Sequence, residues 1–162
     1  MHISKVNVKD NVVTINYTES VVNHASGGVV ESTYTKKCNA LPHNDLLLAM
    51  ANFQFHLANF TLGMVIDGIE ANVETLSKFR IHTIQMRQRQ DFVGVIISGY
   101  CEAIPERFSY VETPQINMGS AEETYKYDYI LSDAVDVLLG ELDLYLTGQK
   151  LGEPQQLELA FE

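Results

Sequence analysis

The chain has 162 residues, of which 46% are hydrophobic, and a formal net charge of −10. This length and composition are typical of one globular domain with a sizeable core. The acidic balance argues against a general nucleic-acid-binding surface, because neutralising phosphates requires clustered Lys and Arg. No apolar run approaches the roughly 18 residues of a membrane span, and the first ten residues lack a signal-peptide core. We therefore expect a cytoplasmic protein with no membrane partner.

The charges are unevenly distributed along the chain. From Ser120 onward the basic residues are Lys126 and Lys150, against ten carboxylates. The segment SKFRIHTIQMRQRQ, in contrast, carries four basic residues and no acid, namely Lys78, Arg80, Arg87 and Arg89. The sequence thus predicts one basic strip on an acidic body.

Alternation of apolar and polar residues predicts that the chain opens with strands. VNVKDNVVTINYTE alternates on both sides of Asp10-Asn11, which is typical of a β-hairpin with a tight turn. A third, β-branched strand is expected over about Val29 to Cys38. A helix should follow from Pro42 to near Gly63, with apolar residues at three- and four-residue spacing at Leu46, Met50, Phe53, Leu57 and Phe60. The segment from Met64 to Ser77 is ambiguous between a loop and a short helix.

The second half repeats this order. FRIHTIQMRQRQ alternates, with Phe79, Ile81, Thr83 and Gln85 expected on one face, and DFVGVIISGYC follows after a turn near Gln90-Asp91. FSYVET can form a sixth strand that must stop at Pro114. Ser120 and Glu123 fit a capping box for a long helix ending near Gly148. Its expected inner face is Tyr127, Leu131, Ala134, Leu138, Leu142 and Tyr145.

These elements predict an α+β fold of two successive β-β-β-α units, which a tandem duplication would explain. The units would form a mainly antiparallel sheet packed by two helices. An OB-like barrel with an added C-terminal helix is the alternative, because the first five strands and the intervening helix match its element order. We expect one domain over residues 1–148 and a flexible tail over residues 149–162, since Gly148, Gly152 and Pro154 interrupt the helix.

Four stretches carry a resemblance that covers most of the chain. They are ALPHNDLLLAMANFQFHL at a helix start, GVIISGY in a strand, VETPQI at a strand end and LDLYLTGQK at a helix end. Together they resemble a family of uncharacterised proteins encoded by bacteriophages and prophages. Gln149 departs from the basic residue expected at that position. The resemblance implies a viral or prophage origin, the cytoplasm of a bacterial host, and a role near phage DNA replication or recombination.

No constellation in the sequence predicts an enzyme, a metal site or a cofactor. The five histidines lack ligand spacing, and His43 is expected to serve the start of the first helix. Asp133 and Asp136 repeat at helical spacing, which is typical of a solvated helix face. Cys38 and Cys101 stand alone and are expected to be free thiols. A non-catalytic function is the prediction.

The basic strip has two interpretations. On a strand, Arg87 and Arg89 would share a face with Gln85, and Phe79 and His82 nearby could stack on bases while Arg80 also contacts phosphate. This would suit single-stranded DNA or another single-stranded nucleic acid. Alternatively, the arginines pair with acids of the C-terminal helix or guard an edge strand against aggregation.

The last residues, EPQQLELAFE, indicate a second partner. QLELAF resembles the bacterial sliding-clamp-binding peptide, in which a glutamine hydrogen-bonds at one subsite and alternate apolar residues fill a pocket. The resemblance implies that Gln156 is the polar anchor, Leu157 and Leu159 are middle contacts, and Phe161 is the aromatic plug. A tail strand added to this sheet, or to that of a neighbouring subunit, is the alternative.

Three functional hypotheses follow. The first is a non-catalytic phage accessory protein in DNA replication or recombination that docks on the host sliding clamp through Gln156, Leu157, Leu159 and Phe161. The second is a single-stranded nucleic-acid-binding protein that uses the basic strip. The third is a self-associating, homo-oligomeric protein or a host-inhibitory protein whose acidic surface mimics DNA.

Overall fold

The computed structural model describes residues 1–62, 73–122 and 125–153. In chain order its elements are β1 (His2–Lys9), β2 (Val12–Val22), β3 (Val29–Cys38), α1 (Asn44–Ala51), α2 (Gln54–Leu62), α3 (Val73–Leu76), β4 (Phe79–Gln88), β5 (Val93–Ile104), β6 (Arg107–Glu112), β7 (Ile116–Met118) and α4 (Asp128–Leu146).

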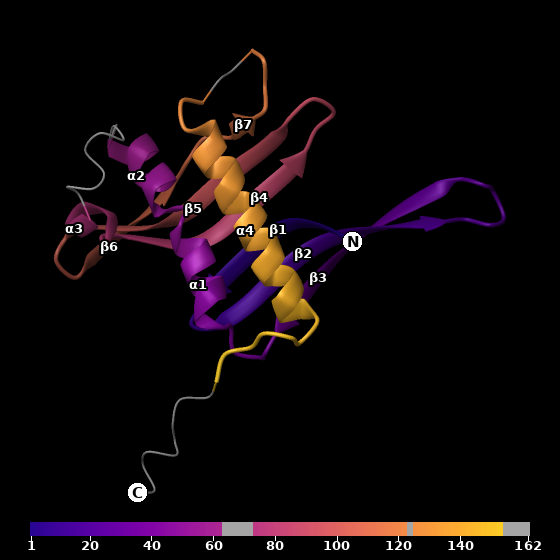
Figure 1. Ribbon diagram of the computed structural model, residues 1–162, viewed down its shortest axis with the longest axis horizontal. Helices are drawn as coiled ribbons and strands as arrows, with labels where there is room; N and C mark the ends of the chain where they lie inside the picture. Colours follow the sequence, from indigo (N-terminus) through magenta and orange to yellow (C-terminus); the bar gives the residue numbers. More distant parts are fainter. Residues whose placement is uncertain (63–72, 123–124, 154–162) are drawn as a thin grey trace, which may run out of the picture.

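One antiparallel sheet organises the molecule (Figure 1). Its strand order is β3-β2-β1-β4-β5-β6, so each half of the chain forms a meander and the two meanders meet where β1 pairs antiparallel with β4. The short β7 pairs with β5 beyond the point where β6 ends. The predicted α+β class and its antiparallel sheet packed by helices are confirmed, and the second half contains an additional short strand, β7, before α4; the sheet is open from β3 to β6. The alternative of an OB-like barrel is therefore wrong.

The predicted hairpin at the start of the chain is confirmed. Asp10 and Asn11 both adopt positive φ, 51° and 62°, between β1 and β2. Two central residues with positive φ match the right-handed twist of flanking strands, and Asn and Asp tolerate this conformation better than most residues. This turn sets the register that places Val6 opposite Ile15, both buried.

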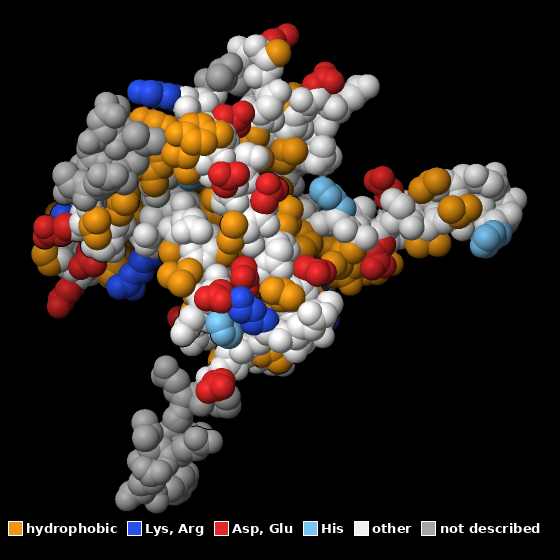
Figure 2. Space-filling model, in the orientation of Figure 1, with side chains coloured by type: hydrophobic (Ala, Val, Ile, Leu, Met, Phe, Trp, Pro, Cys, Tyr) orange, Lys and Arg blue, Asp and Glu red, His pale blue; other side chains and the backbone are white. Residues whose placement is uncertain are grey.

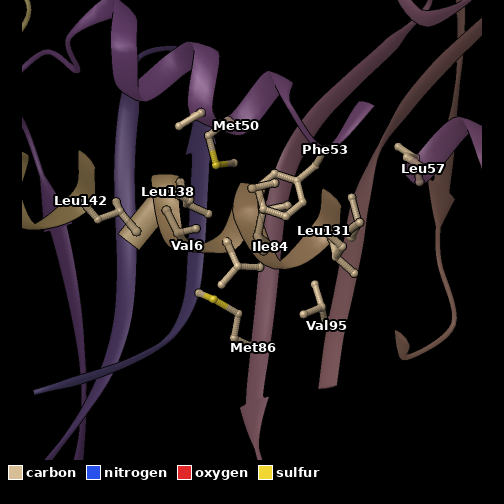
Figure 3. Close-up of a cluster of buried hydrophobic side chains, with 14 of the residues drawn as sticks. Val6, Met50, Phe53, Leu57, Ile84, Met86, Val95, Leu131, Leu138 and Leu142 are labelled. Atoms are coloured by element: carbon tan, nitrogen blue, oxygen red, sulfur yellow. The ribbon is translucent and has the colours of Figure 1, made fainter. Parts of the chain in front are cut away.

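The helices cover one face of the sheet, with α4 lying across it in front of the strands (Figure 1). Each described helix contributes to the same apolar core, for example Met50 of α1, Leu57 of α2, Leu76 of α3 and Leu138 of α4. Figure 3 shows side chains from α1 and α4 meeting those of the strands, among them Val6 and Ile84. The other side of the sheet carries no helix in the described part of the chain, and we call it the open face.

The first predicted helix is divided in two. α1 ends at Ala51 and α2 begins at Gln54, although Leu46, Met50, Phe53 and Leu57 are all buried as expected. Phe60, in contrast, is 39% exposed. His43 caps α1 as predicted, since its Nδ1 accepts a hydrogen bond from the backbone N–H of Asp45 at 3.0 Å.

The C-terminal helix begins later than its predicted capping box. α4 starts at Asp128, after Tyr127 as N-cap, and no side chain caps it. Ser120 lies well before this point, and its hydroxyl accepts from the N–H of Glu122 instead; Glu123 is outside the described residues. The predicted inner face from Tyr127 to Tyr145 is buried throughout. The end near Gly148 is also confirmed, because Gly148 adopts φ of 75° and the helix stops at Leu146.

The first residues after α4 contact the body. Leu151 forms a β-bridge with Pro42, and the N–H of Gly152 donates to the carbonyl of Leu41. Lys150 forms ion pairs with Asp45 of α1 and Glu141 of α4. Among the described helices, none is long and apolar enough to cross a membrane.

Candidate nucleic-acid interface

A β-bulge in β4 decides which side chains reach the open face. Ile81 pairs with Gly99 and Thr83 with Ser98, so His82 is an extra residue without a partner of its own on β5. A bulge reverses the alternation of the strand beyond it. Gly99 permits this geometry, because a Cβ at that position would lie 2.0 Å from the backbone oxygen of Arg80.

The predicted face of β4 is wrong beyond the bulge. Phe79 and Ile81 do face the helices, but Ile84 and Met86 continue that face in place of Thr83 and Gln85. The sequence alternates regularly through this region, so only the pairing with β5 reveals the switch. Phe79 is fully buried in the core and is not available to stack on a base.

Basic side chains converge on the open face. Val6 and Val8 of β1 contribute to the core, so the alternate residues Lys5 and Lys9 project from the other side. Because of the bulge, β4 contributes two cations to the open face, Arg80 before the bulge and Arg87 after it. We call Lys5, Lys9, Arg80 and Arg87 the basic set. It comes from two adjacent central strands, because β1 pairs directly with β4.

Aromatic rings lie beside the basic set. The His82 ring lies 5.0 Å from that of Tyr100 and 5.7 Å from that of Tyr110, measured between centroids. The guanidinium of Arg80 lies 4.8 Å above the ring of Phe108. Tyr110 is 58% exposed and Phe108 is 45% exposed, so both rings present area to solvent. Exposed aromatic faces next to cations are the components with which proteins bind single-stranded nucleic acid.

His82 lies at the centre of this cluster. Its Nδ1 contacts the Thr83 hydroxyl at 2.6 Å, and that hydroxyl also accepts from Asn7 Nδ2 at 2.8 Å. Burial lowers the pKa of His82, Lys9 lowers it further, Glu112 opposes the shift, and Lys5 adds to it. Its Nε2 is buried without a hydrogen-bond partner in the described structure. The nearby carboxylate of Glu112 accepts from Ser98 and Tyr110.

The opposite side of the molecule is acidic. α4 carries five acidic residues and no Lys or Arg, the acids being Asp128, Asp133, Asp136, Glu141 and Asp143. Figure 2 views this helix side, on which carboxylates are spread over the surface and blue cationic groups are few. Asp133 and Asp136 are exposed, as expected for a solvated helix face. The net charge of −10 is therefore distributed unevenly between the helix side and the open face.

Neither structural alternative for the arginines fits their positions. β4 is a central strand between β1 and β5, so its arginines do not guard an edge. The acidic helix lies on the other side of the sheet, and the salt bridges that Lys and Arg form between described residues are those of Lys150 with Asp45 and Glu141. Arg89 lies just after β4, where its backbone N–H donates to the carbonyl of Phe92.

The sequence pattern indicates Arg80, Arg87, Arg89 and His82 but not the rest of this surface. Lys5, Lys9, Tyr100 and Tyr110 belong to three other strands, and strand order brings them together. Their alternation with core residues was the available signal. The predicted peptide residues Gln156, Leu157, Leu159 and Phe161 lie outside the described residues.

A second polar cluster lies inside the molecule. His56 is fully buried, its Nδ1 lies 2.8 Å from the hydroxyl of Tyr125, and Asn59 Nδ2 donates to the same hydroxyl at 3.2 Å. Burial lowers the pKa of His56 to about 4 and raises that of Tyr125 to about 12. Both groups are therefore neutral at physiological pH, which suits a structural hydrogen bond.

The cysteines and the potential metal ligands are the remaining reactive groups considered in the sequence. Cys101 is buried, Cys38 is half-buried, and both are free thiols, as expected. Within the described ranges, no three His, Cys, Asp or Glu side chains are grouped closely enough to hold a metal ion.

Comparisons with known proteins add no identification. No family model matches the chain, and no curated protein or solved structure matches it.

Proposed function

We propose that the protein binds single-stranded nucleic acid across the open face of its sheet. One observation carries this proposal: a bulge at His82 places Arg80 and Arg87 on the same face as Lys5 and Lys9, beside exposed aromatic rings. Cations contact the phosphates while Tyr110 and Phe108 offer ring faces to the bases. Because a stacked base must leave its duplex, single strands are the preferred ligand.

Charge separation orients this ligand. The acidic helix side repels phosphate, whereas the basic set attracts it. The nucleic-acid strand is therefore directed to the open face of the sheet. The span from Arg80 to Arg87 along β4 is about 20 Å at 3.3 Å per strand residue, enough for several nucleotides. No base-specific contact is implied, since stacking on aromatic rings tolerates every base.

Titration of fluorescently labelled single-stranded oligonucleotides with the full chain tests this proposal. Anisotropy should rise with protein concentration, more strongly for a single strand than for a duplex of the same sequence, and the affinity should fall steeply with salt. Equal binding of duplex, or no binding at low salt, would contradict it.

A second proposal concerns the last residues. The clamp-like peptide begins at Gln156, four residues after Gly152, and Leu151 and Gly152 contact Pro42 and Leu41. Docking on a bacterial sliding clamp through Gln156, Leu157, Leu159 and Phe161 would bring a single-strand binder to a replication or recombination site. This would suit the phage context that the sequence resemblance implies.

Deleting residues 154–162 separates the two proposals. The protein that lacks these residues should lose binding to purified clamp and keep its affinity for single strands. The Gln156→Ala and Phe161→Ala variants should weaken clamp binding in the full chain. Equal clamp binding by intact and deleted protein would remove the second proposal and leave the first unaffected.

A further inference from the structure

The outer half of the β2–β3 hairpin extends from the body as an arm (Figure 1). β1 pairs with β2 only as far as Thr18, so residues 19–22 have β3 as their strand neighbour. Four valines near the tip are between 48% and 65% exposed, namely Val21, Val22, Val29 and Val30. Because a two-stranded ribbon is at best marginally stable in water, this apolar arm suits cover by another molecule.

β3 also forms an edge of the sheet. It is ten residues long, pairs with β2 on one side, and is exposed at eight of its positions. A long edge strand presents backbone donors and acceptors that can pair with another strand. Its charges are arranged at opposite ends, with Glu31 near the start and Lys36 and Lys37 near the end.

We propose that β3 pairs antiparallel with β3 of a second copy of this chain, about a twofold axis at Tyr34. Residues opposite each other in an antiparallel ladder lie on the same face of the sheet. Even-numbered residues of β3 are on the helix side, because Cys38 pairs with the buried Val13 and Lys36 with the buried Ile15, so odd-numbered residues are on the open face. A twofold axis through a continuous sheet therefore pairs odd with odd positions, and a register centred on Tyr34 satisfies this requirement.

Charge complementarity selects this register from its neighbours. Centred on Tyr34, the pairing places Glu31 of each copy opposite Lys37 of the other, which makes two ion pairs. A shift by one step of the ladder in either direction would place Glu31 opposite Thr35 or Asn39 instead. Opposite charges directly across a ladder stabilise the pairing, and like charges destabilise it.

Aromatic and apolar side chains support the same arrangement. Tyr34 stacks on Tyr17 at 5.3 Å between centroids, so two copies would align four tyrosine rings across the axis. Val30 of each arm would lie opposite Cys38 of the other copy, on the helix side of the sheet. Val30 would thus gain a neighbour that it lacks in a single chain.

Charge reversal tests the register in the full chain. Glu31→Lys and Lys37→Glu each create two like-charge contacts between copies, whereas within one copy the strand partners of these positions on β2 are the uncharged Ser20 and Thr14. Sedimentation velocity over a concentration series should show a dimer for the unaltered chain and a dimer dissociation constant raised roughly tenfold by each reversal. The double variant should return to about the affinity of the unaltered chain, since the pairs re-form with exchanged signs. A monomer at every concentration, or a double variant weaker than both single variants, would overturn the proposal.

Disulfide cross-linking provides a second test of the strand register. In a Cys38→Ser background, Tyr34→Cys should form a disulfide between copies, because opposite Cα atoms about 4.5–5.5 Å apart suit that bond. Ser32→Cys should not, since its counterpart in the second copy is four residues out of register. Deleting residues 154–162 should leave the dimer intact; loss of the dimer would show that the tail, rather than β3 pairing alone, joins the copies and would overturn the proposal. These measurements contain no nucleic acid, so they stand or fall independently of the proposed function.

Discussion

Arg80 and Arg87 lie on the same face of β4 although an odd number of positions separates them. In a regular strand, residues seven apart project to opposite faces. The bulge at His82 supplies the extra residue that brings them together, and the backbone of Gly99 approaches Arg80 closely at that point. The arrangement of the basic set therefore depends on a glycine in a different strand.

A methyl group at position 99 should be incompatible with the bulge and should destabilise the fold. Its Cβ would lie 2.0 Å from the oxygen of Arg80, and backbone cannot yield as a flexible side chain can. We expect Gly99→Ala to lower the free energy of unfolding by about 3 kcal/mol, measured by urea denaturation.

Gly140 provides the matched control. It lies inside α4, where a Cβ would meet open space, and alanine is the better helix former. Gly140→Ala should stabilise the protein by roughly 1 kcal/mol. Equal effects of the two substitutions would show that the close approach at Gly99 is not required.

His56 should make the protein sensitive to acid. Burial lowers its pKa to about 4, below the ordinary value of 6.5, so the unfolded chain binds the proton first. Its contribution is complete above pH 6.5 and is lost as the pH falls towards 4. The total loss is about 3 kcal/mol in the free energy of unfolding.

Denaturation at a series of pH values with a substituted protein isolates this effect from the carboxylates. His56→Phe keeps an aromatic ring but cannot titrate, so its stability should fall less steeply between pH 6.5 and 4 than that of the unaltered chain. His24→Gln, in the exposed turn between β2 and β3, should leave the slope unchanged. Parallel curves for His56→Phe and the unaltered protein would refute the assignment.

Tyrosine substitutions should distinguish the two sides of the molecule. Tyr110 is 58% exposed on the open face, and Tyr129 is 68% exposed on α4. Tyr110→Ala should weaken single-strand binding by about 5- to 150-fold, as expected for loss of one stacked base. Tyr129→Ala should leave the affinity unchanged in the same anisotropy titration, and an equal loss in both variants would argue against stacking on the open face.

The elements that local patterns encode were predicted well. Alternation around Asp10 and Asn11 predicted the first hairpin, and the β-branched run from Val29 to Cys38 matched β3 from end to end. The apolar spacing of the last helix identified a face that is buried from Tyr127 to Tyr145. In each case the signal lies within a few neighbouring residues.

Features that depend on distant partners were predicted poorly. The switch of face in β4 arises from pairing with Gly99, and the candidate surface combines β1, β4, β5 and β6. The sequence predicts the start of α4 too early, because Ser120 resembles a cap without serving as one. The Arg80 and Arg87 pair was anticipated, but their common face results from tertiary pairing.

The salt dependence of single-strand binding tests the central claim most directly. Arg87 and Arg107 are both exposed arginines of the sheet, but Arg107 lies one position from Phe108 and so projects to the helix side. Each phosphate contact contributes about −0.7 to the slope of log affinity against log salt for a single strand. Arg87→Ala should therefore reduce the steepness of that slope by about 0.7, and Arg107→Ala should leave it unchanged. Equal slopes for the unaltered protein and Arg87→Ala would contradict binding across the open face.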